Sequence, residues 1–251
     1  MELKDIMAQR KIKGVLVKVI NHPAMVIMAQ DCGMDFIFYD GEHGIISEEK
    51  LHDLIVLGNA GGFSSIVRVP QLARRDVSRM LDSGAAGIMV PMIETKEQAE
   101  QLVEWSKYPP IGKRSYSGGA NTHYGPSGNR GKNMEDMNHR TISIVQIETL
   151  KGVENVDEIL EVDGIDAAVI GPCDLGISIG NPDNDMNKEE LKLIKKVADS
   201  CRKYNKAFGI IGGMELQKYF KEDINILVSA IDTKMLRTAL TKAVEEYDSL
   251  E

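Results

Sequence analysis

Several apolar runs rich in β-branched residues end in polar or ionisable side chains. The residues at these ends are Asp40, Glu42, His43, Arg68, Gln146, Glu148 and Asp174. Together they offer carboxylates, an imidazole and a guanidinium, which can hold a divalent metal, transfer protons and stabilise an oxyanion. Each also has a structural interpretation: Asp174 as a helix cap, His43 as a packed side chain and Arg68 as a salt-bridge partner. Their chemistry therefore depends on whether the fold brings them together.

The elements that must position these residues follow from the hydrophobic pattern. The predicted strands cover residues 14–20, 35–40, 64–70, 87–92, 141–148, 167–172, 207–211 and 225–230. Most are continuously apolar, as is typical of parallel strands buried on both faces. Eight such strands alternating with helices over about 250 residues favour a single-domain α/β fold, the (β/α)8 TIM barrel, spanning residues 1–251. A doubly wound sheet is the alternative, but the Gly-x-Gly-x-x-Gly turn common in that fold does not occur here.

Helix signals lie between the strands. Ser47 is expected to cap a helix over 48–60, and the capping box beginning at Thr95 to open a helix that ends near Lys107. The other predicted helices cover residues 73–82, 153–161, 186–204 and 232–250, the last with Asp232 as its cap. The stretch 108–140, rich in Gly, Ser and Asn, is expected to be irregular.

In a (β/α)8 barrel the carboxyl ends of the strands form the active site, so the polar strand ends should converge on one face. Carboxylates gathered there repel one another unless a cation neutralises them. Glu148 and Asp174, hard oxygen ligands on neighbouring strands, suit Mg²⁺ or Mn²⁺. The sequence therefore predicts a divalent metal centre at that face.

At these same residues the sequence resembles the metal-dependent pyruvate aldolases of the HpcH/HpaI (4-hydroxy-2-oxoheptanedioate aldolase) type. Relatives of that family include 2-dehydro-3-deoxyglucarate aldolases and macrophomate synthase. The matching segments, beginning with Asp40-Gly-Glu-His43, stand in the family's order and spacing. They are residues 40–43, 66–70, 81–87 with 90–92, 94–95, 107–110, 146–149 and 170–175.

The resemblance implies a class II aldehyde-lyase that forms or cleaves 4-hydroxy-2-oxo acids through a metal-bound pyruvate enolate and an aldehyde acceptor. Glu148 and Asp174 are implied to hold the metal, Mg²⁺ or Mn²⁺ with Co²⁺ or Zn²⁺ as alternatives. Arg68 is implied to stabilise the enolate, and His43, paired with Asp82, to act as acid and base. The predicted substrate-binding residues are Gln146, Gly171, Pro172, Cys173, Asp40 and Glu42.

Some positions depart from the family pattern. Thr122 stands where the heptanedioate branch has an arginine for the distal carboxylate, which argues against a diacid semialdehyde as the acceptor. The polar residues Tyr116, Asn121, His123 and Tyr124 favour a polar, hydroxylated acceptor instead. The alternative is that they form a polar loop with no chemical role.

Three other functions remain open at this point. A Schiff-base aldolase would need a barrel lysine, and Lys18 is the only lysine within the predicted strands. An acyl-CoA lyase of the citrate-lyase-β type shares the barrel and its acidic ligands. A non-catalytic metal-binding barrel would have lost a key group, and none is missing.

Composition restricts the partners. The formal net charge of −8 argues against nucleic acid or an anionic membrane surface, both of which attract basic proteins. The three cysteines are widely spaced, and the amino-terminal residues are too polar for a signal peptide, so we expect a reduced, cytoplasmic protein. The family usually forms hexamers, so the resemblance implies a homo-oligomer in which the helix 232–250 packs on a neighbouring subunit.

Overall fold

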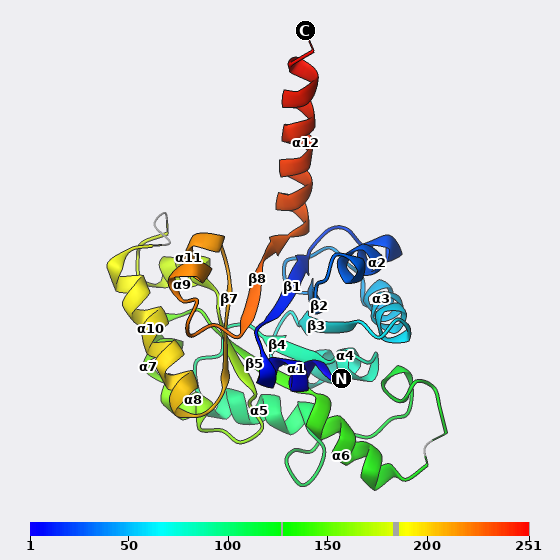
Figure 1. Ribbon diagram of the computed structural model, residues 1–251. Coiled ribbons are helices and arrows are strands. Elements are labelled where there is room, and N and C mark those ends of the chain that lie inside the picture. Colours follow the sequence, from blue (N-terminus) through cyan, green and yellow to red (C-terminus); the bar gives the residue numbers. More distant parts are fainter. Residues whose placement is uncertain (127, 183–185, 251) are drawn as a thin grey trace.

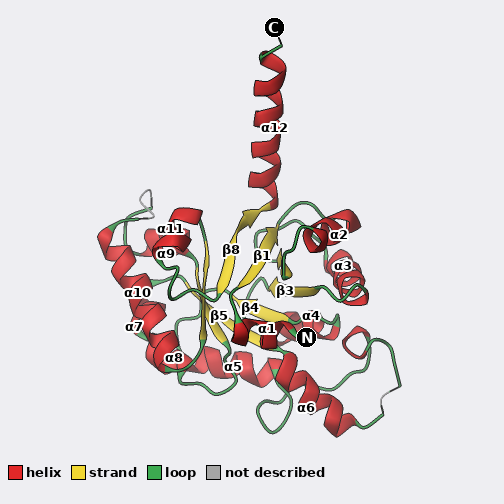
Figure 2. Cartoon of the chain, in the orientation of Figure 1, coloured by secondary structure: helices red, strands yellow, loops and turns green. Residues whose placement is uncertain are grey.

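The computed structural model describes residues 1–126, 128–182 and 186–250. These residues form a closed parallel barrel in which sequential strands are neighbours and β8 pairs with β1 (Figures 1 and 2). The strands are β1 (Ile12–Val17), β2 (Phe36–Asp40), β3 (Ser64–Arg68), β4 (Gly87–Val90), β5 (Ile142–Ile147), β6 (Ala167–Ile170), β7 (Ala207–Ile211) and β8 (Ile226–Ile231). The (β/α)8 barrel predicted from the sequence is confirmed.

The strands read as continuous apolar runs because both of their faces are buried. In β2, Phe36 and Phe38 point into the barrel, whereas Ile37 and Tyr39 pack against the surrounding helices. A Cβ at Gly14 of β1 would collide with the ring of Phe36, so this glycine makes room for the aromatic side chain inside the barrel. The interior is thus a packed core, and only the strand ends are available for chemistry.

Helices surround the barrel (Figure 1). Their bounds are α1 (Leu3–Gln9), α2 (Pro23–Asp31), α3 (Glu48–Ala60), α4 (Arg74–Asp82), α5 (Lys96–Ser106), α6 (Arg130–Arg140), α7 (Leu150–Glu154), α8 (Val156–Leu160), α9 (Pro172–Ser178), α10 (Lys188–Lys203), α11 (Met214–Tyr219) and α12 (Asp232–Asp248). Ser47 caps α3 and the capping box of Thr95 opens α5, as predicted.

Two helix predictions need correction. The stretch 108–140 is not irregular throughout, because α6 occupies its last third. That helix buries only Met137 and Asn138, so it shows little apolar periodicity. The helix predicted over 153–161 is two short helices, α7 and α8, which meet at Asn155.

A buried cluster of charges lies at the amino-terminal ends of the strands. Lys107, which is 1% exposed, contacts Asp166 at 2.9 Å just before β6, and Lys4 of α1 contacts the other oxygen of that carboxylate at 2.6 Å. Burial lowers the pKa of Lys107 to about 8. Leu3 and Met7 of α1 join the barrel interior, so this helix closes the end of the barrel opposite the predicted site.

The last helix, α12, projects away from the barrel (Figure 1). Its exposed apolar side chains include Met235, Leu236, Leu240, Val244 and Tyr247. No helix within residues 1–126, 128–182 and 186–250 combines the length and the apolar character needed to cross a lipid bilayer.

Candidate active site

The side chains predicted at the strand ends form a connected cluster around Arg68. Asp40 and Arg68 are the last residues of β2 and β3 and stand directly opposite each other in the strand register. Arg68 donates from Nε and Nη2 to the two carboxylate oxygens of Asp40, at 3.0 and 2.6 Å. Its Nη1 lies 3.1 Å from Glu42 Oε2 and 3.4 Å from Gln146 Oε1. The guanidinium is therefore held by three side chains, two from the end of β2 and the turn after it and one from β5.

Burial and charge act in opposite directions on Asp40. The side chain is completely buried, which by itself would raise its pKa. The hydrogen bonds and the charge of Arg68 outweigh burial, and the pKa of Asp40 is lowered. Glu42 behaves differently, since burial raises its pKa more than Arg68 lowers it. Asp40 is thus a fixed anion that orients Arg68.

Glu148 lies just beyond β5 and is also buried, at 2% exposure. Its Oε1 accepts a hydrogen bond from the backbone N–H of Met92 at 2.8 Å, and its Oε2 accepts one from Nε2 of Gln146. Met92 adopts a left-handed backbone with a φ of 57°, a strained conformation that places this N–H. A Cβ at Gly171 would collide with Oε2 of Glu148, so the glycine leaves that oxygen room.

The pKa of Glu148 reflects its burial and the carboxylates near it. Burial, together with the nearby carboxylates of Asp174 and Glu42, raises the pKa of Glu148 to about 7. Asp174 is exposed in the first turn of α9 and does not cap that helix with its side chain. Two convergent carboxylates without a compensating cation form a donor set that fits a hard divalent metal.

A cation at this place would not be enclosed by protein ligands alone. Among the residues that the structure describes, no group of three or more His, Cys, Asp or Glu side chains could hold a metal ion. Glu148 and Asp174 would therefore supply two ligands, and water or substrate oxygens the rest, as is usual for Mg²⁺.

A cavity of about 390 Å³ opens at the carboxyl ends of the strands. Seven of the site residues predicted from the sequence line this cavity: His43, Arg68, Gln146, Gly171, Pro172, Cys173 and Asp174. Neither Asp40 nor Glu42 is part of the lining, so their contact with substrate stays a prediction. The cavity thus gathers residues that lie at or just beyond the carboxyl ends of β2, β3, β5 and β6, as the strand-end pattern predicted.

Other residues in the lining were not assigned a binding role from the sequence. They are Leu16, Lys18, Met186, Ile211, Gly212, Gly213, Glu215, Leu216, Ile231 and Lys234. Lys18 follows β1, Gly212 follows β7 and Lys234 follows β8, so the same strand-end rule could have found them. Lys18 was considered only as a Schiff-base lysine, and the structure places its Nζ 3.4 Å from Asp40.

His43 and Asp82 lie apart within the chain. The His43 side chain is about half exposed, and its Nε2 is 3.7 Å from Glu42 Oε2. Asp82 ends α4 and contacts Arg114 at 2.7 Å. The described residues contain no hydrogen bond or ion pair between His43 and Asp82, and their pairing stays a prediction.

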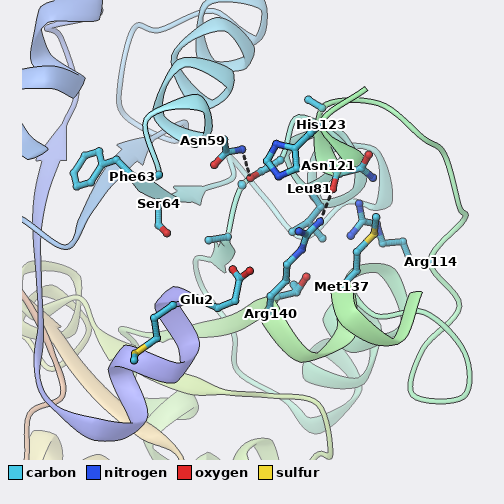
Figure 3. Close-up of a pocket in the computed structure, with 17 residues that line it drawn as sticks. Glu2, Asn59, Phe63, Ser64, Leu81, Arg114, Asn121, His123, Met137 and Arg140 are labelled. Atoms are coloured by element: carbon cyan, nitrogen blue, oxygen red, sulfur yellow. Dashed lines mark hydrogen bonds between the residues drawn. The ribbon is translucent and has the colours of Figure 1, made fainter. Parts of the chain in front are cut away.

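The polar loop after α5 lines a different pocket (Figure 3). This pocket, of about 260 Å³, lies at the amino-terminal end of the barrel beside Ser64, the first residue of β3. Arg114, Asn121 and His123 line it, and Arg140 of α6 donates to the backbone carbonyl of Asn121. Within the chain these residues do not reach the active-site cavity, so their predicted contact with an acceptor is not seen there.

Fold and site together define a (β/α)8-barrel enzyme with an acidic centre beside a buried arginine. Residues 13–239 match the model of the HpcH/HpaI aldolase/citrate lyase family, and the chain belongs to that family. The family resemblance inferred from the sequence is thereby confirmed.

Three comparisons illustrate the relationship. The chain is 30% identical to a 2-keto-3-deoxy-L-rhamnonate aldolase of Salmonella gallinarum over 90% of this chain and 85% of that protein. It is 35% identical to a hydroxypyruvate/pyruvate aldolase of Roseobacter denitrificans, over 82% and 81% of the two chains. A crystal structure of an HpcH/HpaI aldolase from Desulfitobacterium hafniense superposes with a TM-score of 0.93 at 27% identity, covering 99% and 96%. The chain is a carbon–carbon lyase of the aldolase class.

The acyl-CoA lyase alternative fits less well. A citrate lyase β subunit from M. tuberculosis, solved with oxaloacetate and magnesium, has a TM-score of 0.57 and 13% identity, covering 91% and 93% of the two chains. This likeness shows the fold alone. The non-catalytic alternative is weakened too, because every group that the sequence assigned to the chemistry is present.

Proposed function

We propose that the protein joins pyruvate to an aldehyde and cleaves the resulting 4-hydroxy-2-oxo acid. The observation that carries this proposal is the convergence of Arg68, Gln146, Gly171 and Asp174 on one cavity, directly beside Glu148. The aldolase names of the two curated relatives support it.

Glu148 and Asp174 would hold a divalent metal ion, Mg²⁺ or Mn²⁺ with Co²⁺ or Zn²⁺ as alternatives. When bound, such an ion supplies Lewis acidity that makes the methyl group of pyruvate easier to deprotonate. The chain contributes the placement of both ligands. The N–H of Met92 fixes one oxygen of Glu148, and the absent side chain of Gly171 leaves the other accessible.

Arg68 is placed to stabilise the oxyanion that forms when pyruvate loses its methyl proton. The guanidinium lines the cavity, and its two hydrogen bonds to Asp40 prevent it from rotating away. A preorganised cation in a site with little water stabilises developing negative charge strongly. The first turn of α9 would bind the carboxylate of pyruvate through backbone N–H groups.

His43 would take the proton from the hydroxyl group of the aldol. It lines the cavity and is half exposed, so a proton taken from the hydroxyl of the aldol can pass on to solvent. Imidazole is suited to this exchange near neutral pH. Oε2 of Glu42 lies 3.7 Å from Nε2 of His43. Pairing of His43 with Asp82 would need an arrangement other than the one within this chain.

The test needs no knowledge of the aldehyde. Incubation with pyruvate in D₂O, with Mg²⁺ or Mn²⁺ and then with a chelator, should show metal-dependent loss of the methyl proton signal by NMR. Glu148→Gln should abolish the exchange, whereas Glu104→Gln, at an exposed surface ion pair, should not. Exchange that survives the chelator would contradict the proposal.

The Schiff-base alternative is tested with the same protein. Borohydride in the presence of pyruvate would add mass to a protein that forms an imine, and Lys18→Met would prevent that addition. We expect no added mass, because Lys18 is engaged with Asp40.

The protein is further proposed to form a homo-oligomer, a hexamer by family resemblance, in which α12 packs on a neighbouring subunit. The exposed apolar side chains of this helix support the proposal, since a projecting amphipathic helix needs a partner surface.

A further inference from the structure

The active-site cavity contains two lysines that the proposed chemistry does not use. Lys18 directly follows β1, and Lys234 lies in the first turn of α12, just beyond β8. β1 and β8 are neighbours in the barrel, whereas Glu148 and Asp174 follow β5 and β6. The lysines therefore lie across the mouth of the barrel from the proposed metal ligands.

The carboxylates around the cavity have other partners. Asp40 receives two hydrogen bonds from Arg68, and Lys18 is its second, more distant cationic partner at 3.4 Å. Glu215, which lines the cavity near the lysines, is paired with Lys218 at 2.8 Å. Lys234 forms no ion pair within the described part of the chain. Within the described residues, Lys234 thus carries a charge that no ion pair neutralises, and Lys18 shares its carboxylate with Arg68.

Asp232 places both lysines on one rim. This completely buried carboxylate accepts the backbone N–H groups of Lys18, Val19 and Ile20 through Oδ2, at 3.1, 2.8 and 2.8 Å. Its Oδ1 accepts the N–H of Thr233 at 2.7 Å. The turn after β1 is thereby tied to the start of α12. The four hydrogen bonds that Asp232 accepts come from backbone N–H groups, so this carboxylate forms no ion pair with Lys18 or Lys234 among the described residues.

We propose that Lys18 and Lys234 bind an anionic group, a carboxylate or a phosphate, at the end of the acceptor aldehyde remote from its carbonyl. This inference rests on the proposed function and specifies its acceptor. It differs from the expectation drawn from Thr122, because these lysines rather than the absent arginine would bind the charged end. Pyruvate would lie on the side of Arg68, Gln146 and α9, and the acceptor would extend from there toward the lysines. Lysine is a common ligand of phosphate and carboxylate groups because its ammonium is a compact charge on a flexible stem.

Matched pairs of aldehydes test the inference in the aldol reaction with pyruvate. Glyceraldehyde 3-phosphate is compared with glyceraldehyde, and succinic semialdehyde with butanal, by kcat/KM. The wild-type protein should prefer the charged member of at least one pair, and the pair with the larger ratio identifies phosphate or carboxylate as the group recognised. Lys18→Met and Lys234→Met should each lower that ratio at least tenfold.

Two controls sharpen the comparison. Lys221→Met removes an exposed lysine outside the cavity and should leave the ratio unchanged. Lys234→Arg keeps the charge and should retain most of the preference. Higher ionic strength should also reduce the preference, because salt screens exposed charges.

A binding measurement separates this inference from the proposed function. Glycerol 3-phosphate and butyrate carry the anionic group without the aldehyde, and calorimetry can follow their binding to the wild type and to the two methionine variants. Weakening of at least tenfold in both variants supports the inference even if no pyruvate exchange occurs. Failure of both probes to bind, or equal binding by the variants, overturns it even if exchange is rapid.

Discussion

Asp40→Asn should destabilise the protein strongly, because it leaves Arg68 buried without its main counterion. Arg68 is 6% exposed and donates two of its hydrogen bonds to Asp40, which is not exposed at all. Breaking a buried ion pair by removing one partner costs about 3–5 kcal/mol. Glu42 stays 3.1 Å from Arg68 and compensates part of the charge, so we expect about 3 kcal/mol. At about 2–4 °C per kcal/mol for a chain of this size, the melting temperature should fall by about 6–12 °C.

Thermal and urea unfolding followed by circular dichroism, at one fixed protein concentration, measures this effect. Asp35→Asn is the matched control, since the Arg10–Asp35 ion pair has similar distances but an exposed arginine. Its effect should be much smaller. The double variant Asp40→Asn/Arg68→Met should lose less stability than the sum of the two single variants. Strict additivity, or an Asp40→Asn effect no larger than that of Asp35→Asn, would refute the reasoning.

Three further predictions follow from other parts of the molecule. Gly171→Ala should displace the carboxylate of Glu148 and weaken Mn²⁺ binding at least tenfold by calorimetry, with Gly213→Ala as a control because a Cβ there meets nothing within 4 Å. Lys107 has a pKa lowered to about 8 in the folded protein, so the unfolded chain holds the extra proton between about pH 8 and 10.5. Unfolding free energy should therefore rise with pH in that window relative to Lys107→Met, and parallel pH profiles would contradict the lowered pKa. Leu240→Glu on the exposed face of α12 should lower the assembly mass measured by light scattering, whereas Lys242→Gln should not.

The strands and long helices could be predicted because each has a strong periodic signal. Every residue of β2 is buried, and its sequence is almost continuously apolar. In α10 the apolar residues Ile194, Val197 and Cys201 are spaced at helical intervals and form its buried face. α9 and α11 have seven and six residues, too few for a helical period to stand out. α6 was missed for another reason, since its polar sequence turns only a small surface toward the barrel.

The site was predictable where residues belong to strand ends, because parallel strands bring their carboxyl ends to one edge whatever the loops do. Arg68, Gln146 and Asp174 line the cavity for this reason. The partner of His43 was not predictable in this way. Asp82 stands at the end of α4, after a helix that runs back along the barrel, so family order in the sequence says nothing about its distance from His43 within one chain.

The carboxylates Glu148 and Asp174 and the lysines Lys18 and Lys234 lie on opposite sides of the barrel mouth. The two sides therefore suit different ligands. Arg68 and Lys18 lie beside Asp40, and Arg68 also contacts Glu42, but neither forms an ion pair with Glu148 or Asp174 among the described residues. Burial is the largest cause of the pKa of about 7 for Glu148, and repulsion by Asp174 adds to it. That repulsion is relieved either by a proton or by a cation, and a divalent ion relieves it for both carboxylates at once. On the side of β1 and β8, Lys234 forms no ion pair among the described residues, and Lys18 shares Asp40 with Arg68. One side thus suits a cation with the carboxylate and keto oxygens of pyruvate, and the other suits the anionic end of a second substrate.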